Sequence, residues 1–283
     1  MPMTQADIRA HYESHWKTRD AEATDTAGLC FSSPIEDRVA YPIYTQVLRD
    51  LRVTIDGGSV LDIGCGSGRW VRYFLENFKP ALLRGMDITE SSVKLVERFH
   101  ASQGNTRLEF RQADITQAGL PVDRTFDCIN IANVLFHVPE QPLFEQALAN
   151  LKRMLAPCGR ILTTEYLPRT TMRTEWMLVR DRYQFEQSVA AAGLRVVQIR
   201  AFGFFANDPM GIDGPDSAVR AGFQRVRSGI RSVLSSKLDE VSRRFFLDFF
   251  VELENTMLSY CAERMADIDM PSQKLVVLGH RDE

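Results

Sequence analysis

The chain has 283 residues, a net charge of −3 and a hydrophobic fraction of 45%. This length is enough to bury one sizeable core with an appended lobe. The slight acidity argues against nucleic acid as the main partner, because neutralising phosphates requires a basic surface. The polar N-terminus lacks the apolar core of a signal peptide, and no apolar stretch approaches the roughly 20 residues that span a membrane. We therefore expect a cytoplasmic protein with no membrane partner.

Short apolar runs alternate with longer amphipathic runs from residue 60 onwards. The runs that read as strands lie at residues 60–63, 81–86, 108–111, 126–134, 160–164 and 194–200. The runs that read as helices lie at residues 67–77, 91–99, 142–155 and 182–192, and we expect a turn at 157–159. Alternation of this kind implies right-handed βαβ units and a mostly parallel sheet.

Two regions lie outside this alternation. The N-terminal region is expected to be helical, most clearly over residues 35–51. The second region contains two helical runs, and the stronger one, at 241–265, carries a broad apolar face. An apolar strand at 274–278 follows it. We therefore expect an N-terminal helical lid at 1–56, a core at 57–203, a helical cap at 204–270 and a last core strand within 271–283.

Residues 60–70 read VLDIGCGSGRW, a strand that breaks into a glycine loop before a helix. Glycines at such a junction let the backbone turn sharply and approach a ligand closely. A dinucleotide-binding loop has the spacing GxGxxG, which would require glycine where this chain has Arg69. Asp62 precedes the glycines, and its carboxylate would repel a pyrophosphate. It suits instead the ammonium and sulfonium groups of S-adenosylmethionine.

Two further acids follow the next strands of the expected sheet. Asp87 ends the second strand, where a carboxylate can accept hydrogen bonds from ribose hydroxyls. Asp114 follows the third strand and can accept from the adenine amino group while Ile115 packs on the ring. Taken singly, Asp87 could be a helix N-cap and Asp114 a turn residue. Their joint order after the glycine loop favours a cofactor site.

These motifs, in this order, resemble those of the class I S-adenosylmethionine-dependent methyltransferases. The family shows a DxGxGxG loop, an acid ending the second strand and an acid after the third. A later strand begins at Phe-Asp, here Phe126-Asp127, and a turn of the form L-x-P-G-G precedes the fifth strand. The corresponding residues 155–159 read LAPCG, with cysteine in place of the first glycine. The resemblance covers about residues 60–197.

The resemblance implies an α/β fold with a doubly wound seven-stranded sheet, mostly parallel, whose last strand is antiparallel. It also implies S-adenosylmethionine as the cofactor. Asp62 and Gly64 would then hold the methionine moiety, Asp87 the ribose and Asp114 the adenine end. The full set of expected cofactor contacts is Asp62, Gly64, Cys65, Gly66, Gly68, Asp87, Ile88, Asp114, Ile115, Asn133, Tyr12 and Trp16.

A cluster of aromatic side chains at the N-terminus lies at helical spacing. Tyr12 and Trp16 would cover the cofactor if this helix is a lid, although an ordinary surface helix fits the pattern equally well. His11 and His15 are four residues apart and share a helix face. That spacing could bind a metal, but no third ligand is evident and the cysteines lack ligand spacing. We therefore expect no metal site.

The acceptor site of this fold is expected beyond the carboxyl ends of the strands. His137 follows the fourth strand and has the pKa range of a general base, although it could instead merely border the cofactor. Glu165 follows the fifth strand, where it could be a base, bind a polar acceptor, or be a solvated turn acid. We take His137 and Glu165 as the candidate catalytic residues.

The leading hypothesis is a methyltransferase for small molecules, with an oxygen atom of a natural-product, lipid-linked or sugar-type acceptor as nucleophile. Methylation of carbon or nitrogen, methylation of RNA or protein, and a cofactor-binding module without catalysis are the alternatives. The aromatic cap helices suit an apolar acceptor or a homodimer contact. A basic stretch has the charge to contact RNA but is interpreted as a solvated helix face: Arg220, Arg225, Arg227 and Arg231.

Overall fold

The computed structural model describes residues 4–20, 34–100, 105–205, 218–264 and 273–282. The strands are β1 (Ser59–Ile63), β2 (Leu82–Asp87), β3 (Arg107–Gln112), β4 (Phe126–Ile131), β5 (Leu155–Glu165), β6 (Met172–Arg173), β7 (Leu178–Val179), β8 (Leu194–Gly203) and β9 (Gln273–His280). The helices are α1 (Gln5–Asp20), α2 (Pro34–Asp50), α3 (Arg69–Asn77), α4 (Glu90–Phe99), α5 (Gln141–Met154), α6 (Arg182–Ala191), α7 (Ala218–Ser235) and α8 (Glu240–Arg264), with a 3₁₀ turn η1 (Leu135–His137).

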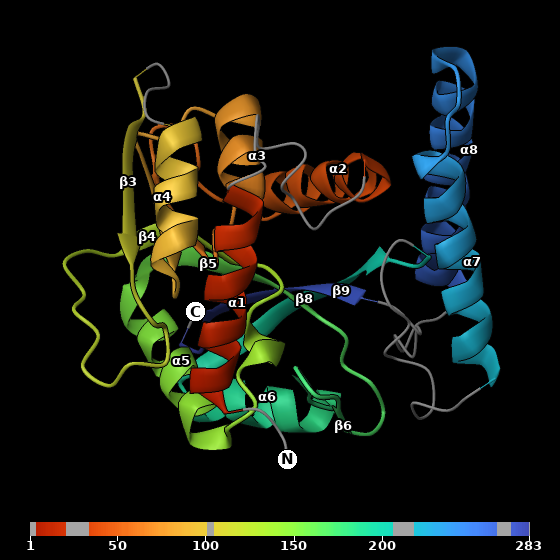
Figure 1. Ribbon diagram of the computed structural model, residues 1–283. Helices are drawn as coiled ribbons and strands as arrows, with labels where there is room; N and C mark the ends of the chain where they lie inside the picture. Colours follow the sequence, from red (N-terminus) through yellow and green to blue (C-terminus); the bar gives the residue numbers. More distant parts are fainter. Residues whose placement is uncertain (1–3, 21–33, 101–104, 206–217, 265–272, 283) are drawn as a thin grey trace.

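Seven strands form one sheet in the order β3-β2-β1-β4-β5-β9-β8 (Figure 1). The pairs formed by β1 to β5 are parallel, whereas β9 is antiparallel to both β5 and β8. The predicted α/β sheet with an antiparallel last strand is therefore confirmed. A helical insertion, α7 and α8, precedes that last strand, as the sequence pattern indicated.

Each face of the sheet buries its own apolar cluster under a layer of helices. On one face α5 and α6 contribute Phe144, Leu148 and Phe185 to the core. On the other face α2 and α3 contribute Tyr44 and Phe74. Strands that are covered on both faces are continuously apolar, which explains why the sequence shows runs rather than alternation here. The two layers fix the positions of the loops at the carboxyl ends of the strands.

Two predicted boundaries around β4 and β5 were wrong. The fourth strand ends at Ile131, because Asn133 has a left-handed φ of 60° and the chain then enters η1. The turn expected at 157–159 lies within β5. Its pairing with β4 shifts from Phe126↔Leu155 to Cys128↔Arg160, so the extra residues form a bulge.

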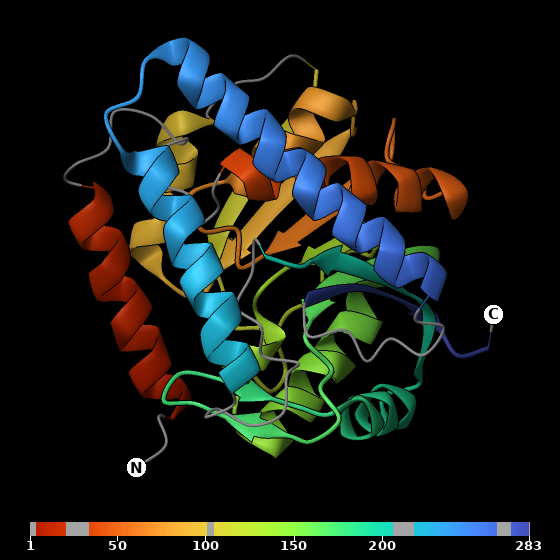
Figure 2. The ribbon, with the colours of Figure 1, turned by 90° about the vertical axis from the view of Figure 1, so that its right-hand side faces the viewer.

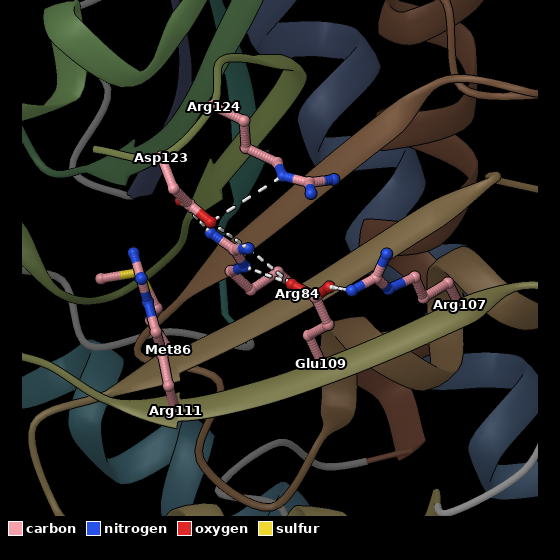
Figure 3. A network of polar contacts seen from close by, with 7 residues as sticks. All are labelled: Arg84, Met86, Arg107, Glu109, Arg111, Asp123 and Arg124. Atoms are coloured by element: carbon pink, nitrogen blue, oxygen red, sulfur yellow. Dashed lines mark hydrogen bonds and ion pairs between the residues drawn. The ribbon is translucent and has the colours of Figure 1, made fainter. Parts of the chain in front are cut away.

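The β2–β3 edge is secured by an ionic cluster centred on Arg84 (Figure 3). Arg84 is 4% exposed and donates to Glu109 on β3 at 2.5 Å and to Asp123 at 2.6 Å. Hydrogen bonding from Arg84 lowers the pKa of Asp123 below its usual range. The cluster ties the connection between β3 and β4 back onto the sheet, and this connection contains Asp114.

The N-terminal and inserted helices pack against different parts of the core. Trp16 of α1 packs on Leu95 of α4, beside the first strands of the sheet. Helices α2, α7 and α8 share a separate apolar cluster with β8, which includes Val39 and Val251. An ion pair of 2.6 Å between Arg38 and Asp248 joins α2 to α8. Figure 2 shows α7 and α8 crossing in front of the sheet, with α1 to one side.

The apolar face predicted for the second cap helix is only partly buried. Val251 and Leu258 of α8 are buried, whereas Phe245 and Phe249 are 63% and 53% exposed. The face is wider than the surface of α2 and β8 that it covers. Among the described helices, none is long and apolar enough to span a membrane.

Candidate functional site

A cavity of about 550 Å³ opens at the carboxyl ends of the parallel strands. Its walls come from the loops after β1, β2, β3, β4 and β5, from α1, and from the α7 side of the cap. This position is where ligands bind in open α/β sheets, because the strand-to-helix loops converge there. Most of the expected cofactor residues line the cavity: Tyr12, Trp16, Gly64, Cys65, Gly66, Asp87, Ile88, Asp114, Ile115 and Asn133.

The glycine loop has a backbone that side chains would obstruct. Gly64 has φ of +71°, and a Cβ added there would lie 2.3 Å from the Cγ2 atom of Val134. Gly66 has φ of +53°, and its added Cβ would lie 3.0 Å from the ring of Trp16. Gly68 caps α3 with φ of +91° and lies outside the cavity lining. The first two glycines therefore keep the cavity floor open, and the third shapes the turn into the helix.

Asp87 is held rigidly at the tip of β2. One carboxyl oxygen accepts from the backbone amide of Gly66 at 3.0 Å, and the other accepts from Thr89 at 3.0 and 2.8 Å. Burial raises the pKa of Asp87, while these donors oppose the shift. Two carboxylate oxygens offer about four acceptor positions, so the group retains capacity for a hydroxyl in the cavity. Asp87 thus both braces the glycine loop and faces the ligand space.

Asp62 lies behind the glycine loop and outside the cavity lining. It is 1% exposed, and its Oδ1 atom accepts from Asn130 at 2.7 Å. Asn130 in turn accepts from the hydroxyl of Tyr44. Within the described residues the Oδ2 atom of Asp62 has no hydrogen-bond partner. Burial raises the pKa of Asp62 to about 7, opposed by the hydrogen bond from Asn130.

Asp114, the third acid, is a turn residue, as its alternative interpretation held, and it also lines the cavity. The Oδ1 atom of Asp114 accepts from the amide and hydroxyl of Thr116 at 2.8 and 2.7 Å. Beside it, Ile115 is buried, and its carbonyl accepts from the buried Asn150 at 2.7 Å. These hydrogen bonds fix the loop after β3, so Asp114 and Ile115 present a formed edge to the cavity.

Asn133 occupies the strained position after β4. Its amide donates to the hydroxyl of Thr164, and its side-chain oxygen accepts from Thr164 and from Gln273 on β9. Asparagine tolerates a left-handed backbone better than most residues, and strain of this kind gathers at functional sites. The bonds to β5 and β9 hold the turn that carries η1.

Helix α1 closes one side of the cavity. The ring of Trp16 lies over Gly66 and is 5% exposed. The hydroxyl of Tyr12 lies 3.1 Å from the Nε2 atom of His137. The Nδ1 atom of His137 lies 3.0 Å from the carbonyl oxygen of Trp176, which can only accept. His137 therefore carries its proton on Nδ1, and its Nε2 atom accepts from Tyr12.

The same burial keeps this pair neutral. Burial lowers the pKa of His137 to about 4, opposed by the hydrogen bond to Trp176. Burial also raises the pKa of Tyr12 to about 12, and the negative charge of Asp87 adds to that shift. At neutral pH an uncharged imidazole therefore faces an uncharged phenol. The hydrogen bond between Tyr12 and His137 joins α1 to η1.

The second candidate catalytic residue lies elsewhere. Glu165 is 5% exposed, accepts from the hydroxyl of Thr163 at 3.0 Å, and is not among the residues that line the cavity. Burial raises the pKa of Glu165 to about 8. Its neighbour Tyr166 faces the cavity instead. The Glu165 carboxyl is therefore buried behind the residues that line the cavity, where it accepts from Thr163.

Several lining residues carry no sequence motif. Phe136, Tyr166 and Met177 form an apolar wall near His137. Arg227 and Arg231 of α7 also line the cavity, so the basic stretch read as a solvated helix face is partly a cavity wall. These residues come from segments separated by up to 95 positions, and no local pattern brings them together. The helical spacing of the arginines was the one available signal.

The residues in and beside the cavity fit S-adenosylmethionine. The buried Oδ2 atom of Asp62 has an acceptor position left beside the loop, which suits an ammonium group. The space above Gly64 and Gly66, which a Cβ would fill, suits the amino-acid chain. Asp87 and Asp114 face the cavity as acceptors for hydroxyl and amino groups. Within the described residues, no group of three His, Cys, Asp or Glu side chains could hold a metal ion.

The family model described as a methyltransferase domain matches residues 60–159. This part of the chain is therefore similar to the methyltransferase domain of S-adenosylmethionine-dependent enzymes. The matched segment contains β1 to β4 with their loops, which supply the glycine loop and all three acids. The cofactor of this family is S-adenosylmethionine.

Curated relatives share this domain and differ in their acceptors. A fatty-acid O-methyltransferase of Mycolicibacterium smegmatis is 30% identical over 151 residues, which cover 53% of this chain and 48% of that protein. A malonyl-[acyl-carrier protein] O-methyltransferase of Halalkalibacterium halodurans is 31% identical over 114 residues, 40% of each chain. Phosphoethanolamine N-methyltransferase 3 of Arabidopsis thaliana is 28% identical over 69% of this chain and 36% of that protein. The chain thus spans half or less of the length of these relatives.

Solved structures share the fold over most of the chain. The cyclase SpnF superposes with a TM-score of 0.58 at 14% identity, over 99% of this chain and 97% of that one. A putative methyltransferase from Haloferax volcanii, solved with the activator Trm112, gives 0.51 at 16% identity over 87% and 92%. At these identities the likeness shows the fold alone.

Proposed function

We propose that this protein transfers a methyl group from S-adenosylmethionine to an oxygen atom of a small molecule. When bound, this cofactor supplies an electrophilic methyl group on a cationic sulfur and leaves as a neutral thioether. The cavity supports the proposal because it runs from the glycine loop to Tyr12, His137 and the apolar wall. One cavity can therefore hold the cofactor and a second molecule. The relatives include enzymes named for oxygen and for nitrogen acceptors.

The acceptor end of the cavity favours an oxygen that is already ionised in water. The observation that carries this choice is the occupied Nε2 atom of His137, which accepts from Tyr12 at 3.1 Å. With its pKa lowered to about 4, His137 is a weak proton acceptor. Removing the proton of an aliphatic alcohol calls for a base whose pKa lies near the working pH. A carboxylate or an acidic phenol needs no such base.

In this proposal His137 is a positioning residue that acts through Tyr12. The imidazole is fixed by the carbonyl of Trp176 and in turn orients the Tyr12 hydroxyl at the cavity wall. The Tyr12 oxygen keeps lone pairs that can accept from an O–H or N–H group elsewhere on the acceptor, because an ionised oxygen has no proton to donate. The acceptor oxygen would supply the electron pair of the new bond to the methyl carbon, and the sulfur of the bound cofactor would keep the pair of the broken bond. The other expected catalytic residue, Glu165, has no place in this step.

The test is methyl transfer from methyl-labelled S-adenosylmethionine to a panel of a carboxylic acid, a phenol, an aliphatic alcohol and an amine. We expect transfer to the carboxylic acid or the phenol and none to the alcohol. The Tyr12→Phe and His137→Gln variants should raise KM for the acceptor several-fold while kcat stays within about threefold. The pH profile between 6 and 8 should be unchanged in both.

Two results would contradict this account. A hundredfold loss of kcat in His137→Gln, with loss of the acidic limb of the pH profile, would make His137 a general base. Transfer to the amine alone would make the protein an N-methyltransferase.

A further inference from the structure

The turn after β4 carries a side-chain amide that lies between the two ends of the cavity. Asn133 is exposed and lines the cavity. Val134, the next residue, lies against Gly64 of the glycine loop. His137, at the end of η1, belongs to the acceptor end of the same cavity. Asn133 therefore lies where the space assigned to the cofactor meets the space assigned to the acceptor.

The side-chain oxygen of Asn133 is fully used by two buried donors. The hydroxyl of Thr164, which is 0% exposed, accepts from the backbone amide of Asn133 at 2.9 Å. A buried hydroxyl proton also needs an acceptor, and here it donates to the Oδ1 atom of Asn133 at 2.8 Å. The buried side chain of Gln273 donates to the same oxygen. An amide oxygen has two lone pairs, so Oδ1 has no further acceptor position.

The nitrogen end of this amide is left for a ligand. The Nδ2 atom of Asn133 has two N–H donors, and no described residue accepts from them. Rotating the amide to offer its oxygen instead would leave the buried donors of Thr164 and Gln273 unpaired, which is costly. The side chain therefore offers donors to the cavity and no acceptor. Such a group binds an oxygen with free lone pairs, whereas an ammonium group gains nothing from it.

Among ionised oxygen acceptors, a carboxylate makes the best use of such a donor. It has two equivalent oxygens, so one can accept from an N–H group while the other attacks the methyl carbon. A phenolate has a single oxygen, and a donor on that oxygen would stabilise the charge that must attack. Hydrogen bonds to an ionised oxygen are also about twice as strong as bonds between neutral groups.

We propose that the Nδ2 group of Asn133 binds one oxygen of a carboxylate on the acceptor, and that the other oxygen receives the methyl group. This inference rests on the proposed function and narrows its acceptor from ionised oxygens in general to carboxylates. The attacking oxygen would supply the electron pair of the new bond to carbon, and the broken bond would leave its pair on the sulfur. No proton needs to move, and the products are a methyl ester and S-adenosylhomocysteine.

The test uses the full chain saturated with S-adenosylhomocysteine, titrated calorimetrically with octanoate, its methyl ester and octylamine. We expect octanoate to bind about tenfold or more tightly than octylamine, since a hydrogen bond to a charged group is worth that factor. With methyl-labelled S-adenosylmethionine, the wild type should convert octanoate to the ester.

Two variants of Asn133 separate the donor from the charge. Asn133→Asp keeps the oxygen for Thr164 and Gln273 but replaces the donor with an acceptor. Affinity for the uncharged ester should then fall at least about tenfold, while affinity for octylamine should not fall. Asn133→Gly suits the φ of 60°, adds no charge and removes the donor, so the KM for octanoate should rise about tenfold. It keeps the test decisive if the aspartate variant fails to fold.

The controls address the cofactor and the added charge. Affinity for S-adenosylhomocysteine should stay within about threefold of the wild type in both variants. Asn255→Asp makes the same chemical change at an exposed position of α8 that does not line the cavity, and it should alter none of the affinities.

Three outcomes would overturn the proposal. Octylamine could bind as tightly as octanoate, or the glycine variant could keep the wild-type affinity and KM for octanoate. Alternatively, both variants could lose as much affinity for S-adenosylhomocysteine as for octanoate, which would assign the amide to the cofactor. Failure of the proposed function looks different, because binding of octanoate that depends on Asn133 would persist while no acceptor in the panel is methylated.

Discussion

The two halves of the cavity are built in different ways. The half that we assign to the cofactor comes from consecutive strand ends between β1 and the loop after β3, where backbone hydrogen bonds and short-range turns fix Asp87 and Asp114. The acceptor half is assembled from α1, η1, the end of β5 and α7, which are far apart in the chain. The first half therefore depends on local geometry that a sequence motif can encode. The second depends on how distant elements pack.

The largest expected effect tests whether the cofactor half depends on backbone geometry. Gly64→Ala should weaken S-adenosylhomocysteine binding by more than about a hundredfold, because the added Cβ would lie 2.3 Å from Val134 on a backbone with positive φ. The measurement is calorimetric titration. Gly119→Ala is the matched control, since Gly119 has φ of +68° and nothing within 4 Å of an added Cβ.

The Gly64 test has a built-in rescue. In Gly64→Ala/Val134→Ala the clash is relieved and only the backbone strain remains, so part of the affinity should return. No recovery of affinity in the double variant would show that crowding against Val134 is not the cause. An equal loss in Gly119→Ala would show that the effect is not specific to the glycine loop.

The second prediction concerns Glu165, which is buried behind the acceptor half, and its effect on stability. The folded protein holds a proton on Glu165 up to a pKa of about 8, whereas the unfolded chain releases it near 4.5. Between these values the folded state binds more protons, so stability falls as pH rises. Glu165→Gln should remove that loss and be more stable than the wild type at pH 8 by about 4 kcal/mol, and by less than about 1 kcal/mol at pH 5.

Urea unfolding at pH 5 and pH 8 measures the effect of the Glu165 substitution. Glu76→Gln, a change at an exposed site on α3, should leave both stabilities unchanged. A Glu165→Gln variant that is destabilised equally at both pH values would mean that the carboxyl is ionised in the folded protein.

A smaller effect is expected where the two halves meet. Trp16→Ala removes the ring that lies over Gly66 and packs on Leu95, so S-adenosylhomocysteine binding should weaken about tenfold. Hydrogen exchange in α1 should increase in the same variant. Lys17→Ala, at a side chain that is 69% exposed on the same helix, serves as the control. Faster exchange with unchanged affinity would separate α1 from the cofactor.

The sequence predicted a mostly parallel sheet with an antiparallel last strand and the residues of the cofactor half, because these follow from local patterns and the order of the motifs. Apolar runs located β1 and β2, and Asp62 together with Arg69 in place of a glycine distinguished the cofactor from a dinucleotide. The end of β4 was missed because its apolar run continues past Ile131, while the left-handed turn at Asn133 depends on hydrogen bonds to β5 and β9. A strand end that is determined by hydrogen bonds to distant residues has no signal in the local sequence.

The acceptor half was predicted only in part for the same reason. The histidine after the fourth strand was identified, but its partner Tyr12 lies 125 residues away, and the protonation of His137 follows from burial and from the carbonyl of Trp176. The helical spacing of Arg227 and Arg231 was visible, whereas the side of α7 that faces the cavity depends on its packing against α2 and α8. Tertiary contacts decided both.

The most direct measurement is S-adenosylhomocysteine affinity in wild type and Asp87→Ala by calorimetric titration. The wild type should bind saturably, and the variant should bind at least about a hundredfold more weakly, because it loses a buried acceptor for the ribose. Thr89→Val, which removes one donor to the same carboxylate, should stay within about threefold and controls for the loop. Equal affinity in the wild type and Asp87→Ala would contradict the assignment of this cavity to the cofactor.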